Sequence, residues 1–373
     1  MNEDSMENTN TQYRQTIDRM AEQLLPFLRT FETVQEEIHF GREREAQERV
    51  RLVAETLFPA LTTAIGEISP PAEMQGFHTT LTQALSCCGE AYTALLKGSG
   101  RNFAEWFLRS RQSLCQALYL LYDIREQLPT LQSYWLTTTA FASFATLEAR
   151  TPNLEAPVGF SHKPRTEKHG EYSLYVPEHY TPDRAWPLIV CLHGGYGQGN
   201  EYIWTWLRPA KSNGYLLLSP KSAGPTWSVL NPPLDIASIE TMMNEVCATY
   251  RVDDKRTYLT GLSDGGTFAY LLGLARADRF AGIAPIAGDF HPMLDPLLRQ
   301  GKGKTTPLLV VHGGKDPIFP IESIRQAWTL FQRLGYHVTA HELPEWGHAY
   351  PYTINEQIVL PWFAILTKAG TGE

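Results

Sequence analysis

One short segment of the sequence has the residue types and spacing that nucleophilic catalysis needs. Residues 261–266 read GLSDGG and place Ser263 between glycines. The segment follows the strand-like run RTYLT and precedes the helix-like run TFAYLLGLARA. A serine on a tight strand-to-helix turn exposes its oxygen beside a helix N-terminus, and flanking glycines allow that turn without Cβ clashes. The pattern is short enough to arise by chance, so it predicts a nucleophile only together with suitable partners.

A serine hydroxyl is a weak nucleophile, so it needs a base and a group that orients the base. His348, in PEWGHAYP, follows the strand-like run HVTAHELP and is the candidate base. Asp316, in LLVVHGGKDPIFP, follows an apolar strand-like run and is the candidate acid. Two alternatives stay open: Asp316 could be a turn former before Pro317, and Asp289 in AGDF is the main rival acid.

A glycine-rich segment, LHGGYGQGN at 192–200, follows the strand-like run WPLIVC. Acyl transfer builds negative charge on the former carbonyl oxygen, and backbone N–H donors aimed at that oxygen lower the barrier. We expect one donor to be the N–H of Asp264 and the other that of Gly195, with Tyr196 as the competing assignment. His193 is expected to brace this loop through a hydrogen bond. The Asp264 carboxylate can point to solvent in the first helical turn, where negative charge is favourable.

Residues from about 155 to 368 resemble an α/β-hydrolase. The resemblance is closest to the compact esterase branch, which includes phospholipase/carboxylesterases, feruloyl esterases and polyhydroxyalkanoate depolymerases. The motifs that carry it are LHGG at 192–195, GLSDGG at 261–266, GGKDP at 313–317 and GHAYP at 347–351. The chain order of serine, acid and histidine is also the order found in this fold.

Together, the residues and the resemblance imply a serine carboxylesterase that hydrolyses a small-molecule ester through an acyl-enzyme. Ser263 would be the nucleophile, His348 the base and Asp316 its orienting acid. No cofactor is expected, and the absence of an HExxH pattern or a tight His/Asp cluster gives no reason to expect a metal. A peptidase or thioesterase with the same triad remains an alternative, as does a catalytically silent hydrolase fold used for binding.

Aromatic residues near the expected pocket are less informative. Trp204, Trp206 and Trp227 fall in predicted loops, and Tyr196 lies in the glycine-rich segment. Trp204, Trp227 and Tyr196 are candidates for lining the acyl or alcohol site, although ordinary packing explains tryptophans in such positions equally well.

Residues 151–373 alternate between strand-like and helix-like runs. The strand-like runs are EYSLYVP, WPLIVCLHG, GYLLLSP, RTYLTG, GIAPIAG, PLLVVHG and HVTAHELP, and the helix-like stretches are 237–250, 265–277, 321–334 and 354–367. Near-continuous apolar strands that alternate with helices predict a mostly parallel sheet covered on both faces. Functional residues collect beyond the carboxyl ends of such strands, and Ser263, Asp316 and His348 each follow a strand.

Residues 1–150 differ in character and lie outside the resemblance. They hold six of the 28 glycines and five of the 25 prolines, and their apolar residues recur at helical spacing. Helices are predicted over 13–39, 43–68, 72–97 and 102–136, which favours an all-α bundle. This domain could be a cap over the ester pocket, an oligomerisation module or a partner-binding module. We favour the cap and expect the stretch after about residue 130 to pack against the hydrolase domain.

Bulk properties set limits on partners and location. The net charge of −8 gives no electrostatic reason to expect nucleic acid as a partner. The polar, acidic start MNEDSMENTNTQYRQT lacks the features of a signal peptide, and no apolar stretch is long enough to span a bilayer. The five cysteines include no CxxC pair. A cytoplasmic protein with free thiols is the expectation.

Overall fold

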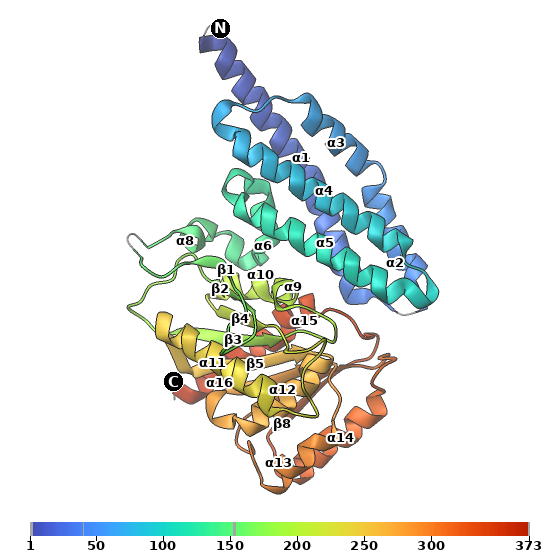
Figure 1. Ribbon diagram of the computed structural model, residues 1–373, viewed down its shortest axis with the longest axis vertical. Helices are drawn as coiled ribbons and strands as arrows, with labels where there is room; N and C mark the ends of the chain where they lie inside the picture. Colours follow the sequence, from blue (N-terminus) through green and yellow to red (C-terminus); the bar gives the residue numbers. More distant parts are fainter. Residues whose placement is uncertain (1–2, 40, 152–153, 372–373) are drawn as a thin grey trace. The chain divides into compact units, whose positions relative to one another are not determined.

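The computed structural model describes residues 3–39, 41–151 and 154–371. The chain divides into two compact units, Met1–Phe141 and Ala142–Glu373 (Figure 1). The first unit is helical and the second is built around one sheet, so each is described by itself.

The second unit contains an eight-stranded sheet in the order β1-β2-β4-β3-β5-β6-β7-β8. The strands are β1 Gly159–Lys163, β2 Tyr172–Val176, β3 Trp186–Leu192, β4 Leu216–Pro220, β5 Val252–Leu262, β6 Gly282–Ile286, β7 Leu308–Gly313 and β8 Val338–Leu343. The contacts of β2 with β1 and β4 are antiparallel, and every other contact between neighbouring strands is parallel. The predicted mostly parallel sheet is thereby confirmed; β1, which is half exposed and weakly apolar, was not predicted.

Helices cover both faces of this sheet. The principal ones are α10 Trp204–Asn213, α11 Pro233–Thr249, α12 Asp264–Ala275, α14 Ile321–Arg333 and α16 Leu360–Thr371 (Figure 1). Successive residues of β5 point to opposite faces: Tyr258 stacks on Phe363 of α16, whereas Leu259 joins the core cluster that contains Phe268 of α12. The central strand is therefore enclosed on both sides, which explains why its sequence reads as a continuous apolar run.

The first unit consists of α1 Glu3–Glu37, α2 Glu43–Ala54, α3 Leu57–Glu67, α4 Gln75–Lys97 and α5 Phe103–Asp123, followed by short helical turns. The helix predicted over 43–68 is two helices, with the break at residues 55–56. Pro59 explains the break, because a proline ring clashes with the carbonyl group four residues earlier, here that of Glu55. The helix predicted over 102–136 ends at Asp123, and the chain then forms brief turns before α6, Gln132–Trp135.

The cysteines are free thiols: Cys87, Cys88, Cys115 and Cys191 are buried and Cys247 is exposed. Burial raises the pKa of Cys191 to about 12, so this thiol stays protonated and unreactive at neutral pH. Over the residues described here, no helix combines the length and the apolar character that crossing a membrane requires.

Candidate active site

Ser263 occupies a strained turn between β5 and α12. Its backbone has φ 57° and ψ −122°, which a residue other than glycine adopts only at an energetic cost. Hydrogen bonds hold the turn: the Ser263 N–H donates to the Ile286 carbonyl at 2.9 Å, and the Thr267 N–H donates to the Ser263 carbonyl at 2.9 Å. A Cβ atom at Gly265 would collide with the carbonyl oxygens of Leu192 and His193. The glycine therefore allows the turn to lie directly against the end of β3.

Two hydrogen bonds connect Ser263, His348 and Asp316. Nε2 of His348 lies 2.8 Å from Oγ of Ser263, and Nδ1 of His348 lies 2.7 Å from Oδ2 of Asp316. A carboxylate only accepts, so the bond to Asp316 assigns the proton to Nδ1 and leaves Nε2 as the acceptor for the serine hydroxyl. These three residues follow β5, β7 and β8, all at the carboxyl ends of parallel strands. The structure thus brings together the three sequence candidates in the arrangement that proton transfer from the serine requires.

The Asp316 carboxylate is buried and held at both oxygens. Oδ1 accepts hydrogen bonds from the N–H groups of Ile318 and Phe319 at 2.8 and 2.9 Å, and Oδ2 accepts from His348. Burial raises the pKa of Asp316, but the hydrogen bond and charge of His348, together with the two N–H groups, outweigh burial and leave the pKa below its usual value. Asp316 is therefore suited to remain ionised and to orient the imidazole.

His312 supports this arrangement from behind and was not a sequence candidate. It is fully buried on β7, its Nε2 donates to the Phe319 carbonyl at 2.8 Å, and the same nitrogen lies 3.4 Å from Oδ2 of Asp316. Desolvation lowers the pKa of His312. The rival acid, Asp289, lies elsewhere in the hydrogen-bond network: its N–H donates to Oγ1 of Thr267, and His348 bonds to Asp316 instead.

The backbone N–H groups of Asp264, Gly195 and Tyr196 differ in whether they already have a hydrogen-bond acceptor. Asp264 is the first residue of α12, so its N–H has no acceptor within the helix. The Gly195 N–H also has no hydrogen-bond acceptor in the part of the chain that the structure describes. The Tyr196 N–H, in contrast, donates to the Pro225 carbonyl at 2.8 Å. Gly195 therefore has the available donor, and the competing Tyr196 donor is already occupied.

His193 braces the glycine-rich loop as a buried neutral imidazole. Its Nε2 accepts from the Ser222 N–H at 3.1 Å, so Nδ1 carries the proton and donates to the Gly194 carbonyl at 2.7 Å. Burial lowers the pKa of His193 to about 3, and the nearby positive charge of Lys221 acts in the same direction. A histidine with such a low pKa is a structural support here and not a base at neutral pH.

The tryptophans proposed to line the pocket lie in the packed interior. Trp204 is 4% exposed and contacts the ring of Phe160, with 4.7 Å between ring centres. Trp227 is 2% exposed, and its Nε1–H donates to the His193 carbonyl at 2.7 Å. Trp206 is fully buried. Trp227 thus supports the loop from behind, whereas Tyr196 is 75% exposed and is the aromatic candidate that presents its side chain to solvent.

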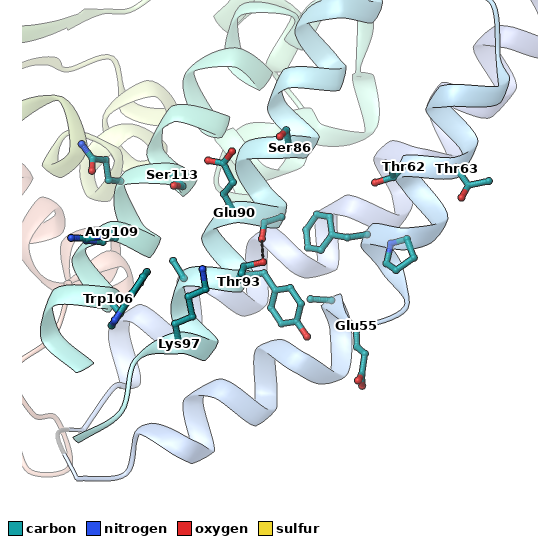
Figure 2. A pocket seen from close by; sticks show the side chains of 17 residues that line it. Glu55, Thr62, Thr63, Ser86, Glu90, Thr93, Lys97, Trp106, Arg109 and Ser113 are labelled. Atoms are coloured by element: carbon teal, nitrogen blue, oxygen red, sulfur yellow. Dashed lines mark hydrogen bonds between the residues drawn. The ribbon is translucent and has the colours of Figure 1, made fainter. Parts of the chain in front are cut away.

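A wide groove of about 1090 Å³ lies in the helical unit, lined largely by α3, α4 and α5 (Figure 2). One wall carries Trp106 with two cations over its ring, Lys97 Nζ at 5.2 Å and Arg109 Cζ at 5.0 Å from the ring centre. The stacked rings of Phe58 and Tyr92 form another part of the lining. The lining residues include no histidine or cysteine, so the groove has no counterpart of the serine–histidine pair formed by Ser263 and His348.

Comparisons with known proteins find similarity to esterases. Residues 236–359 match the Phospholipase/Carboxylesterase family. Feruloyl esterase C from Emericella nidulans is 28% identical over 161 residues, which are 41% of this chain and 57% of that protein. A bifunctional acetylxylan esterase/xylanase from Neocallimastix patriciarum is 26% identical over 158 residues, 40% of this chain and 22% of that protein.

A solved structure of a ferulic acid esterase from Anaeromyces mucronatus aligns with 59% of this chain over 96% of the esterase chain, with 13% sequence identity and a TM-score of 0.45. The chain spans a little over half the length of the feruloyl esterases that it matches. The family match lies wholly within the second unit and includes Ser263, Asp316 and His348. The sheet topology is that of an α/β-hydrolase fold, and residues 236–359 of this unit are similar to the phospholipase/carboxylesterase family.

Proposed function

We propose that the protein is a serine carboxylesterase that hydrolyses carboxylic esters through an acyl-enzyme on Ser263. The observation that carries this proposal is the continuous hydrogen-bonded chain from Ser263 Oγ through His348 to Asp316. The two available N–H groups of Asp264 and Gly195 supply the second requirement, a site for developing negative charge.

In the first half of the reaction, Ser263 Oγ attacks the ester carbonyl while Nε2 of His348 accepts the hydroxyl proton. Asp316 keeps the proton on Nδ1 and stabilises the imidazolium that forms. The carbonyl oxygen becomes an oxyanion held by the N–H groups of Asp264 and Gly195. His348 then gives its proton to the leaving alcohol, and the ester C–O bond breaks to leave the acyl group on Ser263.

In the second half, water replaces the alcohol. His348 accepts a proton from the water as its oxygen attacks the acyl-enzyme, and the same N–H groups stabilise the second oxyanion. His348 returns the proton to Ser263 as the acid product leaves. The proton transfers in both halves use the hydrogen-bonded groups Ser263, His348 and Asp316.

The test is release of p-nitrophenol from p-nitrophenyl acetate and butyrate by wild type and Ser263→Ala. We expect the variant to lose activity by several orders of magnitude, because no nucleophile remains. Ser323→Ala is the matched control, because Ser323 is an exposed serine on α14 of the same unit. Equal rates for wild type and Ser263→Ala would overturn the mechanism.

The names of the relatives suggest which esters to test first. Methyl ferulate represents hydroxycinnamate esters and an acetylated xylan oligosaccharide represents acetyl esters; both belong in the same assay.

For the helical unit we propose a cap that limits access to the ester site, with self-association through the helices as the alternative outcome.

A further inference from the structure

The carboxylate of Asp264 lies beside the two residues that are proposed to hold the oxyanion. Thr226 Oγ1 donates a hydrogen bond to Oδ2 of Asp264 at 2.5 Å. A Cβ atom built on Gly195 would lie 2.5 Å from the same oxygen. The side chain is therefore turned toward Gly195 and Thr226. The sequence alone had allowed it to point into solvent.

The position of this carboxylate is determined by a segment, Ser222–Ser228, that lies over the glycine-rich loop. Three hydrogen bonds tie the two together: Ser222 N–H to His193 Nε2, Trp227 Nε1–H to the His193 carbonyl, and Tyr196 N–H to the Pro225 carbonyl. The segment is itself anchored by Asp235, a buried carboxylate that accepts from the Ala223 and Ser228 N–H groups at 2.8 and 2.7 Å. Thr226 is thus held in place, and its hydrogen bond fixes the position of the Asp264 carboxylate.

No cation pairs with this charge among the residues that the structure describes. Lys221 is the basic residue of the neighbouring segment, but its Nζ donates to the Gly197 carbonyl at 2.8 Å. The carboxylates whose charges act on Lys221 are those of Glu171, Glu201 and Asp235. Among the described residues, Thr226 is therefore the hydrogen-bond partner of the Asp264 carboxylate, and no cation neutralises its charge.

We infer that Asp264 is a specificity-determining residue that makes the ester site select neutral or cationic acyl groups and discriminate against acyl groups that carry a carboxylate near the reacting carbonyl. The inference rests on the proposed esterase function. Its physical basis is Coulombic: two like charges in a partly water-excluded site repel more strongly than in bulk water, and specificity can be achieved by such repulsion alone.

The experiment compares p-nitrophenyl butyrate with mono-p-nitrophenyl succinate, an anionic ester of similar acyl length. The measured quantity is the ratio of kcat/KM for the neutral ester to that for the anionic ester. We expect Asp264→Asn to lower this ratio on the order of tenfold at low ionic strength. Asparagine keeps the size of the side chain and an oxygen that accepts from Thr226, so the change isolates the charge.

Two further variants separate charge from position. Thr226→Val removes the hydrogen bond to Asp264 but keeps the charge, so it should lower kcat for both esters and largely retain the ratio. Asp254→Asn makes the same chemical change at an exposed position near the start of β5 and should change neither the rate nor the ratio. If Asp264→Asn does not fold, the ratio for wild type is measured against salt, because screening should reduce it.

The outcomes are distinct. A ratio in Asp264→Asn within twofold of wild type, or a wild-type ratio that does not respond to salt when the variant fails to fold, overturns the inference and leaves the esterase proposal intact. Absence of Ser263-dependent hydrolysis of the neutral ester overturns the proposed function and the inference with it. A lowered ratio in Asp264→Asn with an unchanged ratio in Asp254→Asn supports the inference.

Discussion

Nε2 of His348 lies 2.8 Å from Oγ of Ser263, although 85 residues separate them in the chain. The two side chains meet because β5 and β8 belong to one sheet and end at the same edge. Asp316 reaches the opposite nitrogen of the same ring from the end of β7.

Replacing Asp316 by asparagine should lower kcat by about 10³- to 10⁴-fold and change KM little. The amide can donate a hydrogen bond to Nδ1, which favours the tautomer whose proton sits on Nε2, so the imidazole can no longer accept the serine proton. The measurement is steady-state hydrolysis of p-nitrophenyl butyrate. Asp289→Asn, at the rival position, should keep kcat within a fewfold of wild type. A larger loss of kcat in Asp289→Asn than in Asp316→Asn would make Asp289 the acid that orients His348.

Replacing Gly265 by alanine should destabilise the second unit by at least about 2 kcal/mol, because the added methyl group collides with two backbone carbonyls that cannot move aside cheaply. Thermal unfolding followed by circular dichroism measures the change. Gly66→Ala is the matched control: a Cβ there meets nothing within 4 Å, and alanine in a helix should be neutral or stabilising by up to about 1 kcal/mol. Equal effects of the two substitutions would contradict the close approach at Gly265.

Stability should depend on pH through His193. The pKa of this histidine is lowered from 6.5 to about 3 in the folded protein, so as pH falls the unfolded chain takes up the proton first. The stability that the neutral imidazole contributes is complete above about pH 6.5 and is lost progressively as pH falls toward 3. Urea unfolding at pH 7.5, 6.0 and 5.0 should show a steeper loss for wild type than for His193→Gln, which cannot titrate. An equal loss of unfolding free energy in the two proteins as pH falls would contradict a lowered pKa for His193.

Removing residues 1–141 should leave a folded hydrolase unit, because the core cluster around the sheet lies wholly in the second unit. If the helical unit is a cap, the truncated protein should hydrolyse long-chain acyl esters relatively faster than the full chain does. A series of p-nitrophenyl esters from acetate to decanoate measures this. An unchanged chain-length profile would exclude the cap and favour self-association or partner binding.

A longer truncation, which removes residues 1–150, tests whether residues 142–150 contribute to the stability of the second unit. Lys211 is fully buried, and its Nζ lies 2.7 Å from carboxylate oxygens of both Glu148 and Glu178. Removing residues 1–150 deletes Glu148 and leaves the buried ammonium with less compensation, so this protein should unfold at a lower temperature than the 1–141 truncation. Equal melting temperatures would show that the pair with Glu148 contributes nothing.

Much of the hydrolase unit was predictable because its signals are local. Apolar runs bounded by glycine and proline predicted seven of the strands, and helical periodicity predicted α11, α12 and α14 close to their observed bounds. The half-exposed strand β1 has no apolar run, and α10 contains Pro209 and ends in Ser212 and Asn213, residue types that also occur in loops. Both were missed because their stability comes from neighbouring elements and not from their own patterns.

The sequence by itself determined which residue types follow which strands: a serine between glycines after β5, an acid after β7, a histidine after β8 and a glycine-rich loop after β3. Only the tertiary structure decided the finer assignments. The Pro225 carbonyl accepts from the Tyr196 N–H and leaves that of Gly195 available, and Thr226 bonds to the Asp264 carboxylate beside the glycine-rich loop across a separation of 38 residues. The packed interior likewise encloses Trp204 and Trp227. Hydrogen bonds and packing between distant segments have no periodicity along the chain, so they become visible only once the sheet has brought those segments together.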